Sequence, residues 1–398
     1  MRISVLCASQ TFGCNSGMYS VDLAAWSLLN RHFPKAEADF AVLYPPRCQI
    51  PNSPFAYSMV PLSEILESDL ILYWGDFLHG RIYRDAVRAQ LVQQGFCTSE
   101  EEALLRVRRF LFLAEAPPEI LAKTLIYGGT LLFNSAEDRL NRAYQQDLKR
   151  LVRGVRRVWM REPFSAFQVN QLQAGESPCA LGTDCALLLR SETLDRFCPA
   201  PVPRTVPKLG IFFGRSQPDL AQTKAFLLEL QREIGGELNW LDWGRAPFFL
   251  DQRAAWTAQL PELGEPQEKP LSPLEALCRL RQLDLVITDT YHICVNAWRL
   301  GIPALCLIDN RNTPLSVNQG EGAARDKRVV FYWTYNLAPF LIYSTALEKE
   351  SSRKERVAAL CTLLHQAPLL KQIQGDLEQH AARAEQRLLQ GMGAILRP

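Results

Sequence analysis

The chain has 398 residues, of which 47% are hydrophobic; this is enough for a large core and favours two domains. Its 44 basic and 42 acidic residues leave a formal net charge of +2, which gives no reason to expect nucleic acid as a partner. No stretch approaches the ~20 apolar residues of a membrane span, and the apolar run in 1–6 stops too early for a signal peptide. We therefore predict a cytoplasmic protein. Such a protein could associate peripherally with a membrane and act on lipid-linked molecules there.

Short apolar runs rich in β-branched and aromatic residues recur along the chain. They are nearly continuous, which is typical of strands buried on both faces of a parallel sheet. Segments with helical spacing separate them, and one of these, Thr98–Phe112, opens with capping signals from Thr98 and Glu101 or from Ser99 and Glu102. The alternation predicts α/β layers. The predicted strands are Ile3–Ala8, Phe40–Tyr44, Leu70–Trp74, Thr124–Tyr127, Leu209–Phe213, Leu283–Thr288 and Ala304–Ile308.

A proline-rich segment divides the chain. Four prolines fall within Phe197–Pro207, which excludes a helix or a central strand there. We predict two Rossmann-like domains facing a central cleft: 1–198 on the acceptor side and 208–345 on the donor side. Residues 199–207 link them, and 346–398 form helices that dock on the body. Ligands should bind at the carboxyl ends of the strands.

The chain has eleven cysteines, which are scattered and form no CxxC pattern. We expect neither a zinc site nor a disulfide framework, but buried reduced thiols. The common nucleotide, phosphate and metalloprotease motifs are absent as well. We expect no divalent metal.

The block that follows the predicted strand at 283–288 carries the strongest signal for a site. Thr288, Asp289 and Thr290 form a polar turn, and His292 opens a helix whose free N–H groups can bind an anion. Arg215 follows another strand, beside Gly214, and its guanidinium could fork onto a carboxylate or phosphate. The alternatives are a structural histidine in a plain helix start and a surface ion pair.

Residues of the first domain are candidates for the acceptor side. Asp76 could hold or deprotonate a sugar hydroxyl, Trp74 beside Gly75 could stack on a sugar ring, and His79 could assist. The alternative is an ordinary strand-end turn with buried aromatic residues. Asn15 and Gly17 follow the first strand and could line the same cleft. For Arg161 and Glu162, which follow another strand, a structural pairing is the favoured interpretation.

In this order, these pieces resemble the polysaccharide pyruvyl transferase family. The counterparts are Asn15 and Gly17, Gly75 and Asp76, Arg161, Glu162 and Ser165, Gly182 and Asp184, Arg215, and the block from Thr288 to His292 with Gly301 and Pro303. The resemblance implies a GT-B-like architecture and transfer of the pyruvyl group of phosphoenolpyruvate onto hydroxyls of a glycan or lipid-linked sugar, commonly as a ketal. It implies phosphoenolpyruvate as co-substrate and no other cofactor. Arginines and the block histidine would bind the donor.

The sequence departs from the family pattern at one position. Many members have an arginine two residues before the histidine, where this chain has Thr290. Arg215 remains, and the cations that could substitute are Arg299, Arg311, Lys327 and Arg328.

The mechanism that fits uses His292 as acid and base, because the pKa of an unperturbed histidine lies near working pH. Asp76 is the weaker candidate on the acceptor side. Two alternatives stay open. One is a nucleotide-sugar glycosyltransferase on the same GT-B frame, with Glu321 holding the ribose. The other is a non-catalytic member of the family that binds glycans or proteins.

Overall fold

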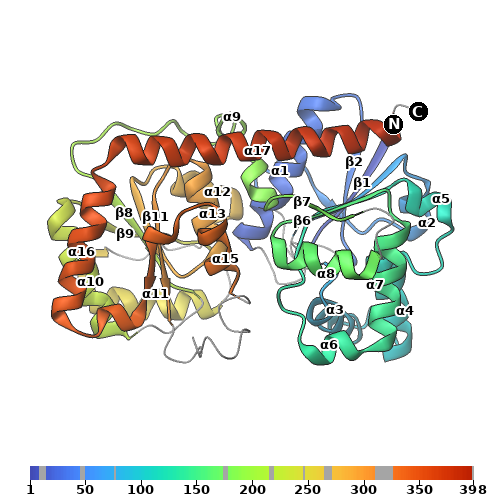
Figure 1. Ribbon diagram of the computed structural model, residues 1–398, viewed down its shortest axis with the longest axis horizontal. Helices are drawn as coiled ribbons and strands as arrows, with labels where there is room; N and C mark the ends of the chain where they lie inside the picture. Colours follow the sequence, from blue (N-terminus) through green and yellow to red (C-terminus); the bar gives the residue numbers. More distant parts are fainter. Residues whose placement is uncertain are drawn as a thin grey trace.

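The computed structural model describes residues 1–8, 15–44, 50–75, 78–173, 178–214, 219–244, 247–263, 271–309 and 326–396. It shows two lobes side by side, each built on its own parallel sheet, with one long C-terminal helix spanning both (Figure 1). This is the predicted α/β fold with two Rossmann-like domains and C-terminal helices. We call the lobes the N-terminal and the C-terminal domain.

The N-terminal domain contains a seven-stranded parallel sheet. Its strand order is β3-β2-β1-β4-β5-β6-β7. The central strands are buried along their whole length because helices cover both faces, which explains why their sequences are continuously apolar. The strands are β1 (Arg2–Leu6), β2 (Glu37–Ala41), β3 (Tyr57–Ser58), β4 (Leu70–Trp74), β5 (Thr124–Gly129), β6 (Arg157–Met160) and β7 (Ala180–Leu181).

The C-terminal domain contains a five-stranded parallel sheet, with the order β12-β11-β10-β8-β9. Its strands begin after the proline-rich segment. They are β8 (Lys208–Phe212), β9 (Glu237–Trp240), β10 (Leu285–Thr288), β11 (Ala304–Ile308) and β12 (Leu341–Tyr343).

Helices separate the strands in both domains. Those of the N-terminal domain are α1 (Ser16–His32), α2 (Leu62–Glu67), α3 (Arg81–Gln93), α4 (Glu100–Phe112), α5 (Pro118–Ala122), α6 (Ala136–Leu140), α7 (Arg142–Gly154), α8 (Pro163–Gln173), the 3-10 turn η1 (Cys185–Leu188) and α9 (Ser191–Leu194). Those that follow are α10 (Leu220–Ile234), α11 (Pro247–Gln259), α12 (Pro273–Leu280), α13 (Tyr291–Arg299), α15 (Lys327–Thr334), α16 (Glu350–Leu364) and α17 (Ala367–Leu396). None of the helices in these ranges has the length and apolar character needed to cross a membrane.

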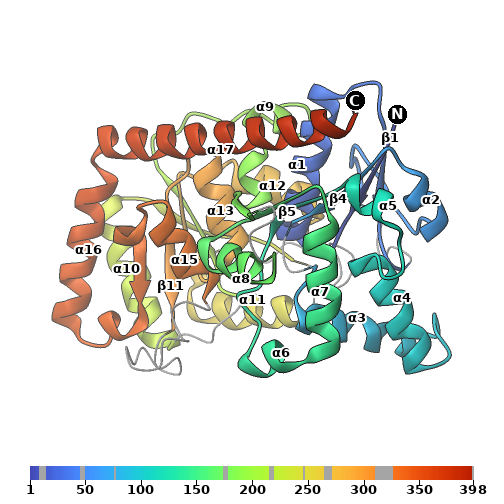
Figure 2. The same ribbon diagram turned by 45° about the vertical axis from the view of Figure 1, so that its right-hand side comes forward.

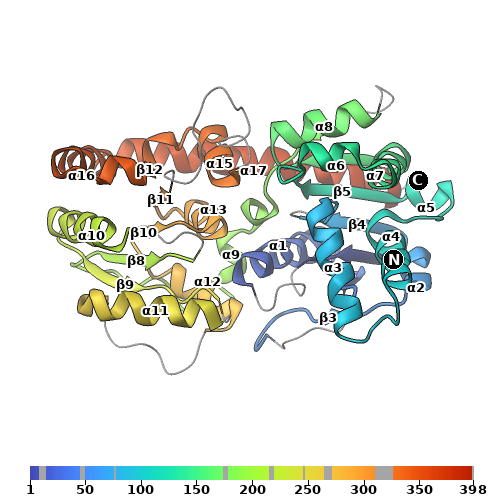
Figure 3. The ribbon, with the colours of Figure 1, turned by 90° about the horizontal axis from the view of Figure 1, so that it is seen from below.

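The two domains share a continuous apolar core. Side chains from one face of the N-terminal sheet join those of α1 and continue through α12 and α13 into the C-terminal sheet. Helix α1 lies between the two sheets, beside α12 and α13 (Figure 3). The opposite face of the N-terminal sheet packs separately against α3, α4 and α7.

The C-terminal helix α17 ties the domains together from outside. It runs along the top of both lobes (Figures 1 and 2). The carboxylate of Glu385 accepts hydrogen bonds from Arg31 (3.0 Å), Arg190 (3.2 Å) and His32 (2.7 Å). Further along, Gly391 lies so close to Trp159 that a Cβ there would come within 2.5 Å of the indole ring.

One cysteine prediction is wrong. Cys198, at the end of the N-terminal domain, forms a disulfide with Cys278 on α12. No local pattern could indicate this pair, because the two cysteines are 80 residues apart and meet only when the second domain packs on the first. The other described cysteines are buried thiols, as expected: Cys7, Cys97, Cys179, Cys185, Cys294, Cys306 and Cys361.

Candidate functional site

The first turns of α1 and α13 meet where the two domains come together. A Cβ on Gly17 would lie 2.6 Å from the Cβ of His292, so the missing side chain is what admits the histidine. One turn further on, the Asn296 side-chain amide donates to the Ser20 hydroxyl at 2.8 Å. We call this contact between the two helix starts the junction.

His292 is held firmly at the junction. It is 5% exposed and lies in the first turn of α13, directly after β10, as the sequence predicted. Its ring meets the ring of Tyr291 edge-on, with centroids 5.0 Å apart. The structure therefore brings together Gly17 and His292, which were predicted for acceptor binding and catalysis.

Asn15 lies beside them but acts as a helix cap. Its side-chain oxygen accepts from the backbone N–H groups of Gly17 (2.9 Å) and Met18 (3.4 Å). Its backbone forms an isolated β-bridge with Gly244 of the C-terminal domain. Asn15 thus fixes the start of α1 against the other domain, and its predicted contact with an acceptor stays a prediction.

The turn of Thr288, Asp289 and Thr290 is buried and internally bonded. The Thr288 hydroxyl accepts from the Thr290 N–H at 3.1 Å, and the Thr290 hydroxyl donates to Asp289 at 3.1 Å. The same Asp289 oxygen accepts from the N–H of Gly214 at 2.8 Å, which joins the ends of β10 and β8. Thr290 forms no side-chain cap on α13, so the first N–H groups of that helix are not capped by it.

Two predicted residues cannot be placed in this geometry. Arg215 and Asp76 lie outside the described residues, as do Arg311 and Glu321. Gly214, the neighbour of Arg215, is fixed by Asp289 at the junction side of β8. The roles of Arg215 and Asp76 stay predictions.

Trp74, Gly75 and His79 lie away from the junction surface. Trp74 is 0% exposed, stacks on Tyr127 and donates its indole N–H to the Val21 carbonyl at 2.6 Å. Gly75 has a φ of 79°, and a Cβ there would come within 2.5 Å of Val21. Here the alternative of a strand-end turn with buried aromatic residues describes the geometry, and we correct the prediction that Trp74 stacks on a sugar.

His79 is a core histidine. Its ring lies against those of Tyr73 and Phe112, at centroid distances of 4.6 and 5.8 Å. Burial lowers the pKa of His79 to about 3, so the imidazole is neutral. His79 cannot reach an acceptor from this position, so the prediction that it assists on the acceptor side is wrong.

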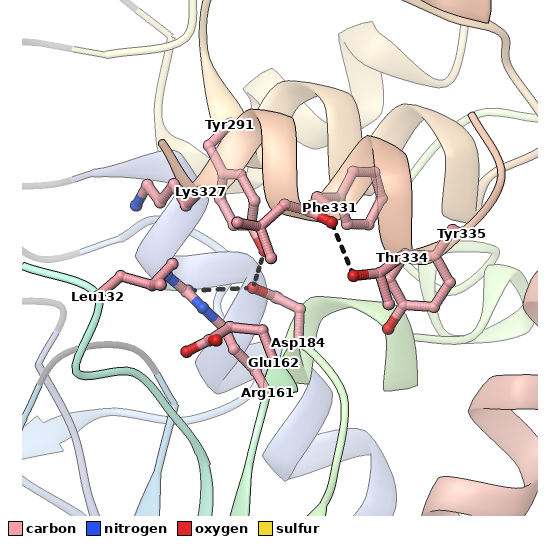
Figure 4. A pocket seen from close by; sticks show the side chains of 10 residues that line it. Leu132, Arg161, Glu162, Asp184, Tyr291, Lys327, Phe331, Thr334 and Tyr335 are labelled. Carbon is pink, nitrogen blue, oxygen red and sulfur yellow. Dashed lines mark hydrogen bonds and ion pairs between the residues drawn. The ribbon is translucent and has the colours of Figure 1, made fainter. Parts of the chain in front are cut away.

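A polar pocket lies beside the junction and is lined by both domains (Figure 4). Arg161, at the end of β6, binds the carboxylate of Asp184 at 3.3 Å, and both side chains are buried. The Tyr291 hydroxyl reaches across from the C-terminal domain and donates to the same Asp184 oxygen at 2.9 Å. The Arg161 guanidinium lies over the Tyr291 ring, 5.0 Å from its centroid. We call this narrow space, of about 10 Å³, the junction pocket.

Lys327 adds a second cation from the C-terminal domain. Its ammonium lies 4.7 Å from the centroid of Tyr291 and also faces the Phe133 ring, at 5.9 Å. Burial and the charge of Asp184 raise the pKa of Tyr291, so its hydroxyl stays protonated and donates. A carboxylate or phosphate entering the pocket would meet Arg161 and Lys327, and it would compete with Asp184 for Arg161.

The remaining candidate residues are bonded elsewhere. Glu162 accepts from the Thr130 hydroxyl (3.1 Å) and from the Ser165 N–H (3.0 Å) in neighbouring turns, which is the favoured structural interpretation. Arg328 binds Asp326 and the carbonyl of Asp289. Arg299 donates to the Leu189 carbonyl at 2.7 Å.

Sequence reasoning did not predict that Arg161, Asp184 and Tyr291 belong to the site. Arg161 was interpreted as structural, and Tyr291 was only the neighbour of a histidine. The available signal was that Arg161 and Asp184 both follow strands at the carboxyl edge of one sheet, where ligands usually bind.

Comparison with known proteins gives fold similarity only. No protein-family model and no curated protein sequence matches the chain. Among solved structures, MnaA of S. aureus in complex with UDP has a TM-score of 0.52 at 10% identity, covering 99% of this chain and 96% of that chain. UDP-GlcNAc 2-epimerase of Methanocaldococcus jannaschii has a TM-score of 0.50 at 13% identity, covering 98% of this chain and 99% of that chain. These matches confirm the GT-B-like fold; none of the comparisons shows the pyruvyl transferase family.

Proposed function

We propose that this protein is a sugar-modifying transferase whose phosphate-bearing donor binds at the junction. The observation that carries the proposal is the junction pocket, in which Arg161 of one domain and Lys327 of the other flank Tyr291. The start of α13 lies next to it and offers N–H groups that Thr290 does not cap. Fixed cations and helix N–H groups are what a phosphate needs.

The first candidate donor is a nucleotide sugar. Its support is the fold, which resembles those of MnaA with UDP and of UDP-GlcNAc 2-epimerase over nearly the whole chain. In this scheme the diphosphate binds at the start of α13 and the sugar points toward the N-terminal domain. Ligands of open α/β sheets bind at such strand ends.

Phosphoenolpyruvate is the second candidate, favoured by a separate observation. Motifs that resemble those of pyruvyl transferases gather around one point: Gly17 touches His292, and Arg161 and Asp184 meet Tyr291. Their pocket is narrow, at about 10 Å³, so a compact anion would need less opening of the domains than a whole nucleotide sugar.

His292 is the acid and base in either reaction. With a nucleotide sugar, the acceptor hydroxyl gives its proton to His292 as its oxygen bonds to the anomeric carbon, and the nucleotide leaves with the electron pair of the broken C–O bond. With phosphoenolpyruvate, His292 gives a proton to the methylene carbon and takes one from the acceptor hydroxyl whose oxygen bonds to C2. A second acceptor hydroxyl then bonds to C2 and closes the ketal, while phosphate leaves with the electron pair of the broken C–O bond and takes the proton of that hydroxyl. Arg161 and Lys327 stabilise the charge on the departing group.

A thermal-shift panel with product analysis tests the proposal. UDP-, GDP- and CMP-sugars and phosphoenolpyruvate are added to the wild type, to Lys327→Gln and to Lys354→Gln, a matched exposed lysine on α16. A true donor at 100 times its Kd should stabilise the wild type and Lys354→Gln by about 2.7 kcal/mol, and Lys327→Gln less.

The products then identify the donor. Release of a nucleotide supports the first candidate, and release of inorganic phosphate from phosphoenolpyruvate supports the second. His292→Ala should abolish either release while the donor still shifts the melting temperature. If no anionic donor stabilises the wild type and no acceptor yields product, the chain is a binding protein and the proposal is wrong.

A further inference from the structure

A second pocket lies on the outer side of the N-terminal domain. Its walls come from the segments after β2 and β3 and from α4, a helix that all three ribbon views place on the side away from the C-terminal domain (Figures 1 to 3). Its volume is about 510 Å³. We call it the α4 groove; its lining residues are Val42, Leu43, Met59, Val60, Pro61, Leu62, Glu102, Leu105, Arg106, Arg109 and Phe110.

Most of this lining is apolar, and while Val42, Leu43 and Phe110 are buried, other apolar side chains reach the surface. Met59 is 48% exposed, and Val60, Leu62 and Leu105 are half-buried. Contiguous apolar surface of this kind on a folded chain commonly marks a binding site. An apolar ligand would gain stabilisation by removing this surface from water.

Arg106 places a positive charge in the apolar groove. Its guanidinium donates to the carbonyls of Leu43 (3.1 Å) and Phe96 (3.3 Å) and contacts the sulfur of Met59 at 3.4 Å. Within the described ranges it forms no ion pair. The chain has therefore fixed a cation with neutral acceptors, and this leaves its charge for an incoming anion.

The other charged groups of the groove are engaged elsewhere. Arg109 forms an ion pair with Glu115 at 2.7 Å. Glu102 accepts from the backbone N–H and the hydroxyl of Thr98, both at 2.7 Å, and these bonds with the charge of Arg106 lower its pKa. Thr98 thus holds the Glu102 carboxylate in the first turn of α4, and Arg106 is the cation that a ligand can pair with.

The groove opens at the same sheet edge as the junction. Val42 and Leu43 follow the carboxyl end of β2, and β2 pairs in parallel with β1, the strand that precedes α1 in the sequence. An extended acceptor could therefore lie along this edge, anchored in the groove at one end and reacting at the junction with the other.

We propose that the α4 groove binds the apolar chain of the acceptor, a saccharide joined through phosphate to a long alkyl or isoprenyl chain, with Arg106 at the phosphate. That this ligand is the acceptor of the reaction rests on the proposed function. The groove itself is independent of the donor site, so the two can be tested apart.

Calorimetric titration with monomeric decyl phosphate, below its micelle concentration, tests the groove. The wild type should bind one molecule at least 10-fold more tightly than decanol or inorganic phosphate. Arg106→Gln and Leu105→Asn should each weaken binding about 10-fold. Leu140→Asn, at a 79% exposed leucine on α6, is the control and should bind like the wild type. Leu105→Asn keeps the bonds of Arg106, so it remains informative if Arg106→Gln folds poorly.

Three outcomes would overturn the proposal. They are decanol binding as tightly as decyl phosphate, unchanged binding in both groove variants, and binding only to vesicles of anionic phospholipid, which would make the groove a membrane contact. Donor-induced thermal shifts of the same variants separate the two proposals. If the donor binds normally and decyl phosphate does not bind, only the proposal for the α4 groove is refuted. If decyl phosphate binds and no donor does, only the proposed function is refuted.

Discussion

Gly17 is the residue on which the junction depends most directly. Any larger side chain would meet the Cβ and ring of His292 at 2.6 to 2.8 Å, well inside van der Waals contact. The Cβ of His292 cannot rotate away as the end of a flexible side chain could. Relief therefore requires α1 and α13 to move apart, which would displace His292 and disturb the packing.

Gly17→Ala should lower the free energy of unfolding by about 1–3 kcal/mol, although alanine is the better helix former. Gly375→Ala on α17, where a Cβ meets nothing within 4 Å, is the matched control and should stabilise by about 0.5–1 kcal/mol. Urea denaturation of both variants measures the difference. Equal stabilisation by the two substitutions would show that His292 does not lie against Gly17.

At the scale of elements, α17 is anchored by one carboxylate. Burial favours a raised pKa for Glu385, but the hydrogen bonds from His32 and Arg31 and the charges of Arg31 and Arg190 lower it below its normal value. A folded pKa below the unfolded one stabilises the protein fully above the unfolded value. That stabilisation is lost as the pH falls through the folded pKa.

Glu385→Gln should cost about 2 kcal/mol at pH 7, because the guanidinium groups of Arg31 and Arg190 lose an ionised acceptor. The difference from the wild type should shrink as the pH falls from 4.5 through the lower folded pKa, because Glu385 of the wild type then becomes protonated too. Glu378→Gln, an exposed position on the same helix, should stay within about 0.5 kcal/mol at every pH. Denaturant unfolding between pH 3 and 7 measures this, and a pH-independent cost would contradict the anchor.

At the scale of the whole molecule, two side-chain bonds couple the domains at the junction. Tyr291 donates to Asp184, and Asn296 donates to Ser20. Each joins the first turns of α13 to the N-terminal domain. A donor bound between the domains would therefore experience any change in these bonds.

Tyr291→Phe removes the hydrogen bond to Asp184 and should loosen the segment around η1 in the N-terminal domain. Tyr332→Phe is the matched control, because it also removes a buried hydroxyl, whose partner, Ala304, lies in the same domain. Each should cost about 1 kcal/mol. Hydrogen exchange of peptides around η1 should rise in Tyr291→Phe and stay unchanged in Tyr332→Phe. Equal exchange in the two variants would mean that Tyr291 does not couple the domains.

Much of the fold could be predicted from local pattern. Leu70–Trp74 and Ala304–Ile308 form strands with the predicted bounds, because a strand buried on both faces must be apolar along its length. For the start of α4, one of the two capping alternatives is observed: the Ser99 hydroxyl accepts from the N–H of Glu102. These features depend on neighbours within a few residues.

The site was predictable only in part. The placement of His292 at a helix start after a strand follows from the local sequence. The placement of Gly17 after the first strand follows in the same way. The sequence could not show that Trp74 and His79 are buried, because a residue after a strand lies in the core or at the surface according to the helix that covers it. It also could not show that Arg161, Asp184 and Tyr291 converge.

The sequence by itself therefore determined the strands, the helix starts and the place of His292 after β10, since these depend on hydrogen bonds and apolar periodicity close along the chain. Only the tertiary structure decided which polar residues share a site. Asp184 and Tyr291 are 107 residues apart, and Gly17 and His292 still further; such pairs form when two domains bury their apolar faces together. The same packing closed the Cys198–Cys278 disulfide.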